Sequence, residues 1–180
     1  MPPERARGTV EPDGDEHATI TFLRAYRHRP ERVWDAITTP EGLRAWLLCT
    51  EARIDARVGG EIELVSGPAA YRSRGTILAW DPPNVFAYEW NVAPVPEMPR
   101  GEHAIFRYEL AWDGAVTRLV VTYRRITRGT AQGFVVGVHA LLDRLEAQLD
   151  GAALPDFHTR FVALRAEYPS WSHDAPAAGQ

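Results

Sequence analysis

One long helical pattern near the C-terminus constrains the fold of this chain most strongly. From Thr130 to Leu149 the apolar residues recur with the period of an amphipathic helix. They are Phe134, Val138, Leu141, Leu142, Leu145 and Leu149. Most segments before it alternate apolar and polar residues, which is typical of strands with one buried face. Because no other element is long enough to cover those faces, the sequence predicts an antiparallel sheet packed on one helix.

The strand patterns are separated by clear turn signals. Gly59-Gly60, Asp81-Pro82-Pro83-Asn84 and Asp113-Gly114 each mark a turn between two neighbouring strands. The predicted strands are Thr19–Tyr26, Arg53–Val58, Glu61–Val65, Tyr71–Trp80, Val85–Asn91, Ala104–Trp112 and Thr117–Arg124. The segment Asn91–His103 contains three prolines and is predicted to be a surface loop.

Short helices are predicted on either side of this strand series. Pro30 suits the first position of a helix whose apolar face includes Trp34 and Ile37. Thr39-Pro40-Glu41 is a second start signal, with a capping hydroxyl and an acid near the positive helix end. Phe157 and Phe161 indicate one further short helix after the long one.

This order of elements resembles the activator of heat-shock protein 90 ATPase homologue-like family, within the START-like, or SRPBCC, superfamily. The likeness covers about residues 18–151 and includes Gly75-Thr76-Ile77, Phe86-Ala87-Tyr88-Glu89-Trp90 and Leu142-Asp143-Arg144-Leu145. Phe134 stands where the family usually has tryptophan. The resemblance implies an α+β helix-grip fold, in which a curved antiparallel sheet wraps around the C-terminal helix and leaves a cavity. It implies no particular ligand and no catalytic set.

The chain length is appropriate for one domain with a substantial core. We expect a single START-like domain over residues 18–171, with flexible tails at 1–17 and 172–180. The N-terminal segment lacks the apolar stretch of a secretory signal, and no apolar run is long enough to cross a bilayer. The expected location is therefore cytoplasmic, without a membrane partner.

Composition excludes several kinds of chemistry. All 20 residues counted as lysine or arginine are arginine, so neither a lysine Schiff base nor a P-loop lysine can form. Genomic base composition is the simplest explanation for the absence of lysine. The sequence does not indicate a functional role for this absence. Cys49 is the single cysteine, which excludes an intramolecular disulfide. A net charge of −4 does not indicate a nucleic-acid surface.

The histidines do not indicate a metal site, since no two have the spacing of helix-borne ligands. We therefore expect no metal, no cofactor and no recognised catalytic residue. His139 borders the apolar face of the long helix, where its ring either reaches the cavity wall or hydrogen-bonds a backbone carbonyl or water. Cys49 is expected to be a buried, inert thiol.

Aromatic residues on successive strands are the best candidates for a ligand pocket. Their rings offer apolar faces with a few polar atoms, which suits a flat hydrophobic ligand with some oxygens. We expect the pocket to open near the Asn91–His103 loop. The candidate pocket residues are Tyr71, Trp90, Phe106, Tyr108, Tyr123, Phe134, Val138 and His139.

The sequence thus favours a protein that binds a hydrophobic small molecule, either aromatic or lipid-like. Two alternatives stay open. A cavity-based enzyme, such as a hydrolase or an aromatase/cyclase, would need two converging polar groups, for example His139 with an inward arginine or glutamate. The second alternative, which the family resemblance implies, is an accessory protein for a chaperone ATPase. The sequence is also compatible with a homodimer.

Overall fold

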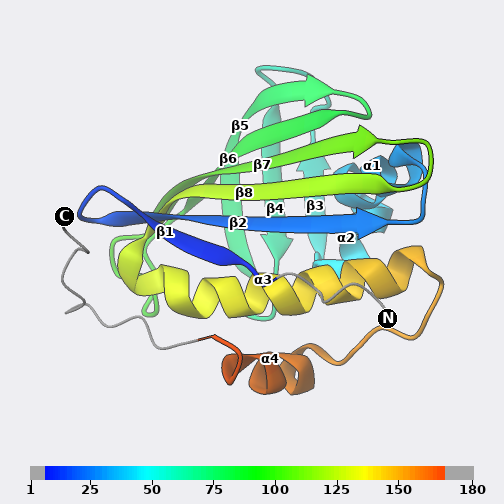
Figure 1. Cartoon of the computed structure of the whole chain (residues 1–180). Coiled ribbons are helices and arrows are strands. Elements are labelled where there is room, and N and C mark those ends of the chain that lie inside the picture. The colour runs from blue at the N-terminus through cyan, green and yellow to red at the C-terminus, as the bar shows by residue number, and fades with distance from the viewer. Residues whose placement is uncertain (1–6, 169–180) are drawn as a thin grey trace, which may run out of the picture.

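An antiparallel sheet wrapped around one long helix forms the framework of the computed structural model, which describes residues 7–168. Within these residues eight strands follow the order β1-β2-β8-β7-β6-β5-β4-β3, and every neighbouring pair is antiparallel. Figure 1 shows the curved sheet above helix α3. The strands are β1 (Thr9–Asp13), β2 (His17–Tyr26), β3 (Glu51–Ile54), β4 (Glu61–Ser66), β5 (Tyr71–Asp81), β6 (Val85–Val92), β7 (Glu102–Trp112) and β8 (Thr117–Thr127). The predicted α+β helix-grip fold is confirmed.

Helix α3 (Arg128–Leu149) covers the concave side of the sheet. Its residues Leu142 and Leu145 are fully buried, as the apolar period predicts. Helices α1 (Pro30–Thr38) and α2 (Pro40–Trp46) follow β2. The Thr39 hydroxyl caps α2 by accepting the Gly42 N–H at 3.1 Å. Trp46 then ties the two helices together, because its Nε1–H donates to the Ala36 carbonyl at 2.8 Å.

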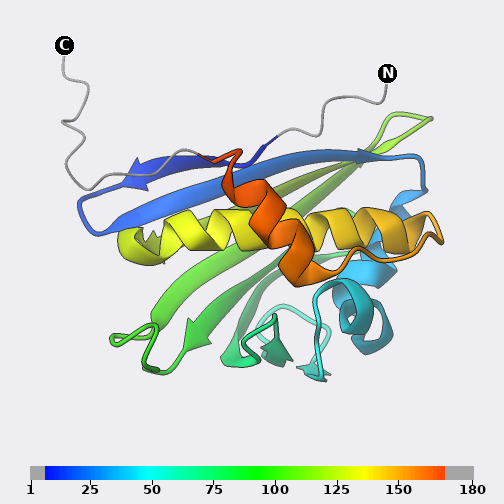
Figure 2. The same ribbon diagram turned by 90° about the horizontal axis from the view of Figure 1, so that it is seen from below.

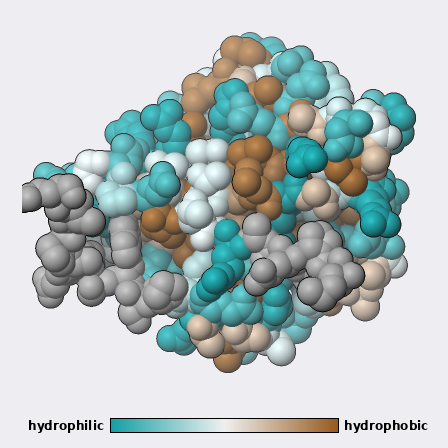
Figure 3. All heavy atoms as spheres, viewed as in Figure 1, coloured by the Kyte–Doolittle hydropathy of each residue, from teal (hydrophilic) through white to brown (hydrophobic). Residues whose placement is uncertain are grey.

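The outward positions of the sheet carry most of its charge. Arg72 pairs with Glu63 and with Glu51 on neighbouring strands, and Arg74 pairs with Glu63 at 3.0 Å. The space-filling view in Figure 3 mixes hydrophilic residues with separate apolar patches on the face seen in Figure 1. The inward positions are mostly apolar, so the alternating patterns correctly identified the buried side of the strands.

The prediction that residues 1–17 form a flexible tail is wrong for most of its length. Thr9–Asp13 forms edge strand β1, and Val10 pairs with Ile20 of β2. The segment was missed because it has no apolar alternation and contains Pro12, a residue tolerated at a sheet edge. Gly14 takes a positive φ of 71° in the turn to β2. Residues 1–6 and the predicted tail 172–180 lie outside the described residues.

Several other boundaries also differ from prediction by a few residues, and two of them concern the loops. Strand β3 ends at Ile54, because Asp55 to Gly60 turn back toward β4 and the Gly60 N–H donates to the Arg57 carbonyl. Strand β7 begins at Glu102 inside the predicted loop, where Glu102 pairs with Val92 of β6. The second difference matters for the site, since it turns Glu102 from a loop residue into an inward-facing strand residue.

A buried ion cluster fastens the last helix, α4 (Phe157–Arg165), across α3. Asp143 of α3 has a fully buried side chain. Its Oδ1 lies 3.1 Å from Nη1 of Arg24 on β2, and its Oδ2 lies 2.6 Å from Nε of Arg160 on α4. Figure 2 shows α4 crossing α3 on the side away from the sheet. One carboxylate therefore links the sheet, the long helix and the terminal helix.

Replacing Asp143 with alanine should lower the free energy of unfolding by about 3–5 kcal/mol, because Arg24 would stay buried without its counter-charge. Urea denaturation measures this change. The matched control is Asp150→Ala, which removes the partner of His28 from a pair in which the aspartate is half exposed. That variant should lose at most about 1 kcal/mol. Equal losses in the two variants would contradict the role assigned to the cluster.

Candidate functional site

A pocket of about 760 Å³ lies between the concave sheet and the first half of α3. Strands β6, β7 and β8 form its floor, and α3 forms its roof. The loop between β6 and β7, the turn after β4 and one side of α4 complete the wall. Exposed residues at its rim include Pro68, Arg100 and Val162. The predicted opening near the Asn91–His103 loop is consistent with this geometry, since residues 97–102 line the pocket.

A series of glycines on α3 borders the mouth of the pocket. Gly129, Gly133 and Gly137 follow each other at intervals of four residues and all line the pocket. A Cβ added at Gly129 or Gly133 would meet nothing within 4 Å. The same row continues with the buried leucines Leu141, Leu145 and Leu149. Gly129 and Gly133 are exposed, and a Cβ at Gly137 would approach Phe157 and Phe161 of α4, so the glycines border the mouth of the pocket on the α4 side.

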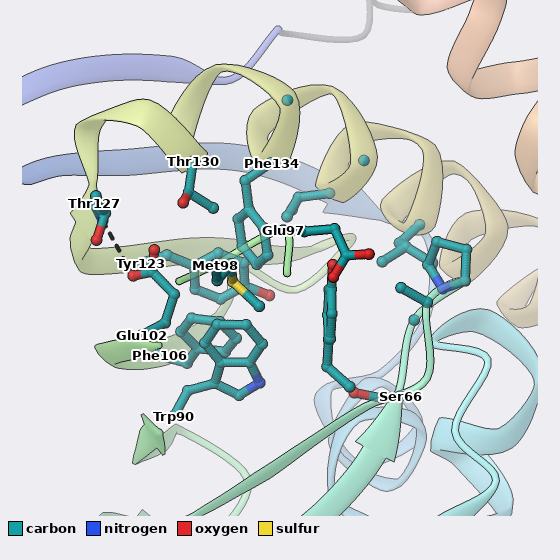
Figure 4. A pocket seen from close by; sticks show the side chains of 18 of the residues that line it. Ser66, Trp90, Glu97, Met98, Glu102, Phe106, Tyr123, Thr127, Thr130 and Phe134 are labelled. Atoms are coloured by element: carbon teal, nitrogen blue, oxygen red, sulfur yellow. Dashed lines mark hydrogen bonds between the residues drawn. The ribbon is translucent and has the colours of Figure 1, made fainter. Parts of the chain in front are cut away.

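Aromatic rings cover the sheet side of the pocket. Phe106 of β7 stacks on Trp90 of β6 at a centroid distance of 4.9 Å and on Tyr123 of β8 at 3.8 Å. Phe134 of α3 lies 5.5 Å from the Trp90 ring on the opposite side. The strand register causes this stacking. Phe106 pairs directly with Tyr123, and it lies two residues along β7, on the same face, from Ala104, the partner of Trp90. These rings, shown in Figure 4, form a rigid apolar wall.

Three buried phenols add polar atoms to this wall. The hydroxyls of Tyr108 and Tyr123 lie 2.6 Å apart, and Tyr88 hydrogen-bonds Tyr108. Burial raises the pKa of each phenol above its usual range. All three hydroxyls are therefore neutral at physiological pH. They can donate or accept hydrogen bonds with a neutral ligand group, but they do not supply a phenolate base.

Glu102 is a pocket residue that sequence reasoning missed. It is 2% exposed, and its Oε2 accepts the Thr127 N–H at 3.2 Å. Its Oε1 has no hydrogen-bond partner among residues 7–168. The available signal was that Glu102 continues the inward alternation of Ala104 and Phe106. The prolines before it favoured a loop instead, which hid that continuation.

All but one of the predicted pocket residues line the pocket: Tyr71, Trp90, Phe106, Tyr108, Tyr123, Phe134 and Val138. Whether they contact a ligand stays a prediction. His139 does not belong to this group. Its ring lies edge-on to Phe22 at 5.9 Å, and its Nδ1 lies 2.7 Å from the Tyr168 hydroxyl. One residue along a helix rotates a side chain by about 100°, so Val138 faces the pocket while His139 faces the Asp143 cluster.

Cys49 also lies outside the pocket lining. Its Sγ donates to the Glu51 carbonyl at 3.1 Å, and burial raises the pKa of the thiol. These features fit an inert thiol better than a nucleophile. Within the described part of the chain, no three histidine, cysteine or acidic side chains are placed to hold a metal ion. No helix among residues 7–168 is long and apolar enough to cross a membrane.

Alkaline titration should test the buried phenols. Because folding raises the pKa of Tyr88, Tyr108 and Tyr123, the stability they contribute should be complete below the unfolded value of about 10 and decline as pH rises above it. Their phenolate absorbance should thus appear together with the loss of circular dichroism. Tyr123→Phe should reduce the rise in absorbance that accompanies unfolding, whereas Tyr71→Phe, at a half-buried position, should not. Full tyrosine ionisation of the folded protein would contradict the neutral cluster.

Comparisons with known proteins agree with the fold. The family model described as "Activator of Hsp90 ATPase homolog 1-like protein" matches residues 27–150. CalU16 from Micromonospora echinospora is 22% identical, with a TM-score of 0.67 over 93% of this chain and 96% of that protein. A protein from Bordetella parapertussis is 25% identical, with a TM-score of 0.65 over 93% and 94% of the two chains. A protein from Mesorhizobium loti is 24% identical, with a TM-score of 0.65 over 76% of this chain and 99% of that one. No curated protein matches the chain.

Proposed function

We propose that this chain, which belongs to the Activator of Hsp90 ATPase homolog 1-like family, binds a hydrophobic small molecule that contains aromatic or other flat rings. The pocket between α3 and the concave sheet carries the proposal. Its volume of about 760 Å³ lies within the usual range of small-molecule sites, and its walls are mainly apolar with a few polar atoms. Stacked, immobile rings such as Trp90 and Phe106 suit a flat ligand, because little side-chain freedom is lost on binding.

The candidate catalytic groups named from the sequence do not support turnover in this pocket. A hydrolase or cyclase of the kind considered from sequence needs a nucleophile or a base beside the substrate. The phenols of Tyr108 and Tyr123 are held neutral by burial, and His139 and Cys49 lie outside the pocket. The acidic and histidine side chains of the lining are Glu97, Glu102 and His158, and Oε2 of Glu102 is engaged by the Thr127 N–H. We also propose a cytoplasmic location, which is supported by the single cysteine of the chain.

Filling the pocket should abolish binding without harming the fold. The neutral fluorophore N-phenyl-1-naphthylamine should bind the wild-type protein with increased emission. Gly133→Leu places a branched side chain at an exposed position in the mouth of the pocket, and we expect the affinity to fall roughly tenfold or more because this side chain obstructs the entrance and removes buried contact. Stability should not fall, because leucine is the better helix former. Fluorescence titration and a thermal melt measure the two effects.

Two further variants control this experiment. Gly133→Ala should weaken binding less than Gly133→Leu, since it fills less of the space. Ala163→Leu adds the same apolar bulk at an exposed position of α4 outside the pocket lining and should leave binding unchanged. Unaltered affinity in Gly133→Leu, or no binding by the wild type, would contradict the proposed function. Native mass spectrometry of freshly purified protein can then identify a co-purified compound.

A further inference from the structure

Resting on the proposed function, we propose that the ligand presents a hydrogen-bond donor, a hydroxyl or an amine, to Oε1 of Glu102. The contact lies at the end of the pocket below the start of α3. The inference concerns the chemical class of the ligand, because an ionised carboxylate accepts hydrogen bonds but donates none. It follows from the position, the burial and the incomplete hydrogen bonding of this one side chain.

Glu102 faces the pocket because of its place on β7. It shares the inward face of the strand with Phe106 and Tyr108, and it is almost fully buried. Figure 4 shows its side chain at the Thr127 end of the pocket, on the same side as the rings of Phe106 and Trp90. A carboxylate in such surroundings is costly unless its oxygen atoms are hydrogen-bonded.

One oxygen of Glu102 has a structural role. Thr127 is the N-cap residue of α3, and Oε2 of Glu102 accepts its backbone N–H at the start of the helix. The positive end of the helix dipole also stabilises the carboxylate there. This role accounts for Oε2 and for the burial of the charge. It leaves Oε1 without a hydrogen-bond partner among the described residues, and Glu102 is one of the residues that line the pocket.

A donor on the ligand would complete the hydrogen bonding of Glu102, whereas a ligand carboxylate or phosphate would be repelled there. The tyrosine hydroxyls lie farther along the sheet, and a strand rises about 20 Å over the six residues from Glu102 to Tyr108. A ligand of one or two rings can therefore reach only one of these polar regions. The two regions can be tested separately with small probes.

The test compares 2-naphthol, which has a donor, with 2-methoxynaphthalene, which has the same rings and none. Each probe competes with N-phenyl-1-naphthylamine for the wild type, Glu102→Gln and Tyr123→Phe. The wild type should prefer the naphthol. In Glu102→Gln the amide oxygen can keep the Thr127 contact, so the amide NH2 faces the pocket in place of Oε1. The preference should then shift roughly tenfold toward the methoxy compound, the usual size for a hydrogen bond to a charged group.

The control variant and the wild type keep the inference falsifiable. Tyr123→Phe removes another pocket hydroxyl and should retain the wild-type preference. Loss of the preference in Tyr123→Phe but not in Glu102→Gln would overturn the assignment to Glu102. Equal binding of both naphthalenes by the wild type would overturn the inference and leave the proposed function standing, and this comparison needs no variant. Failure of all three probes to bind the wild type would contradict both.

Discussion

The incomplete packing of α3 on the sheet is the constraint from which the candidate site follows. The leucines of its second half, including Leu142 and Leu145, are fully buried and hold the helix in place. The first half of the helix carries exposed glycines at the mouth of the pocket, on the side of α4. Close packing elsewhere in the core keeps the space beside them open, because a rigid helix anchored at one end does not bend to close it. The shape of the pocket mouth is thus a consequence of residue size along α3.

The opposite side of α3 is held by polar contacts in addition to apolar ones. Asp143 gathers Arg24 and Arg160 around one buried carboxylate, and the Tyr168 hydroxyl contacts both His139 and the Gly8 N–H. This arrangement positions α4, which lies beyond the residues matched by the family model and yet lines the mouth of the pocket with Phe157 and Phe161. Stability and pocket shape are therefore linked through a helix outside the matched region.

The sequence predicted the features that depend on local period. The apolar repeat of α3 and the alternation of strands such as Val85–Asn91 led to the fold and to most of the pocket residues. An inward aromatic side chain on these strands must face either the helix or the space between helix and sheet. It failed where long-range contacts decide. Strand β1 depends on pairing with β2, and the orientation of His139 depends on a 100° rotation from its neighbour Val138. Glu102 was hidden because the end of a proline-rich loop is set by pairing with Val92.

A crystal structure of the complex with N-phenyl-1-naphthylamine tests the central claim most directly. The account predicts the two aromatic groups of the probe inside the pocket, against Phe134 of α3 and the stacked Trp90 and Phe106, which already contact one another. A complex in which the probe lies on the outer surface, away from these rings, would contradict it.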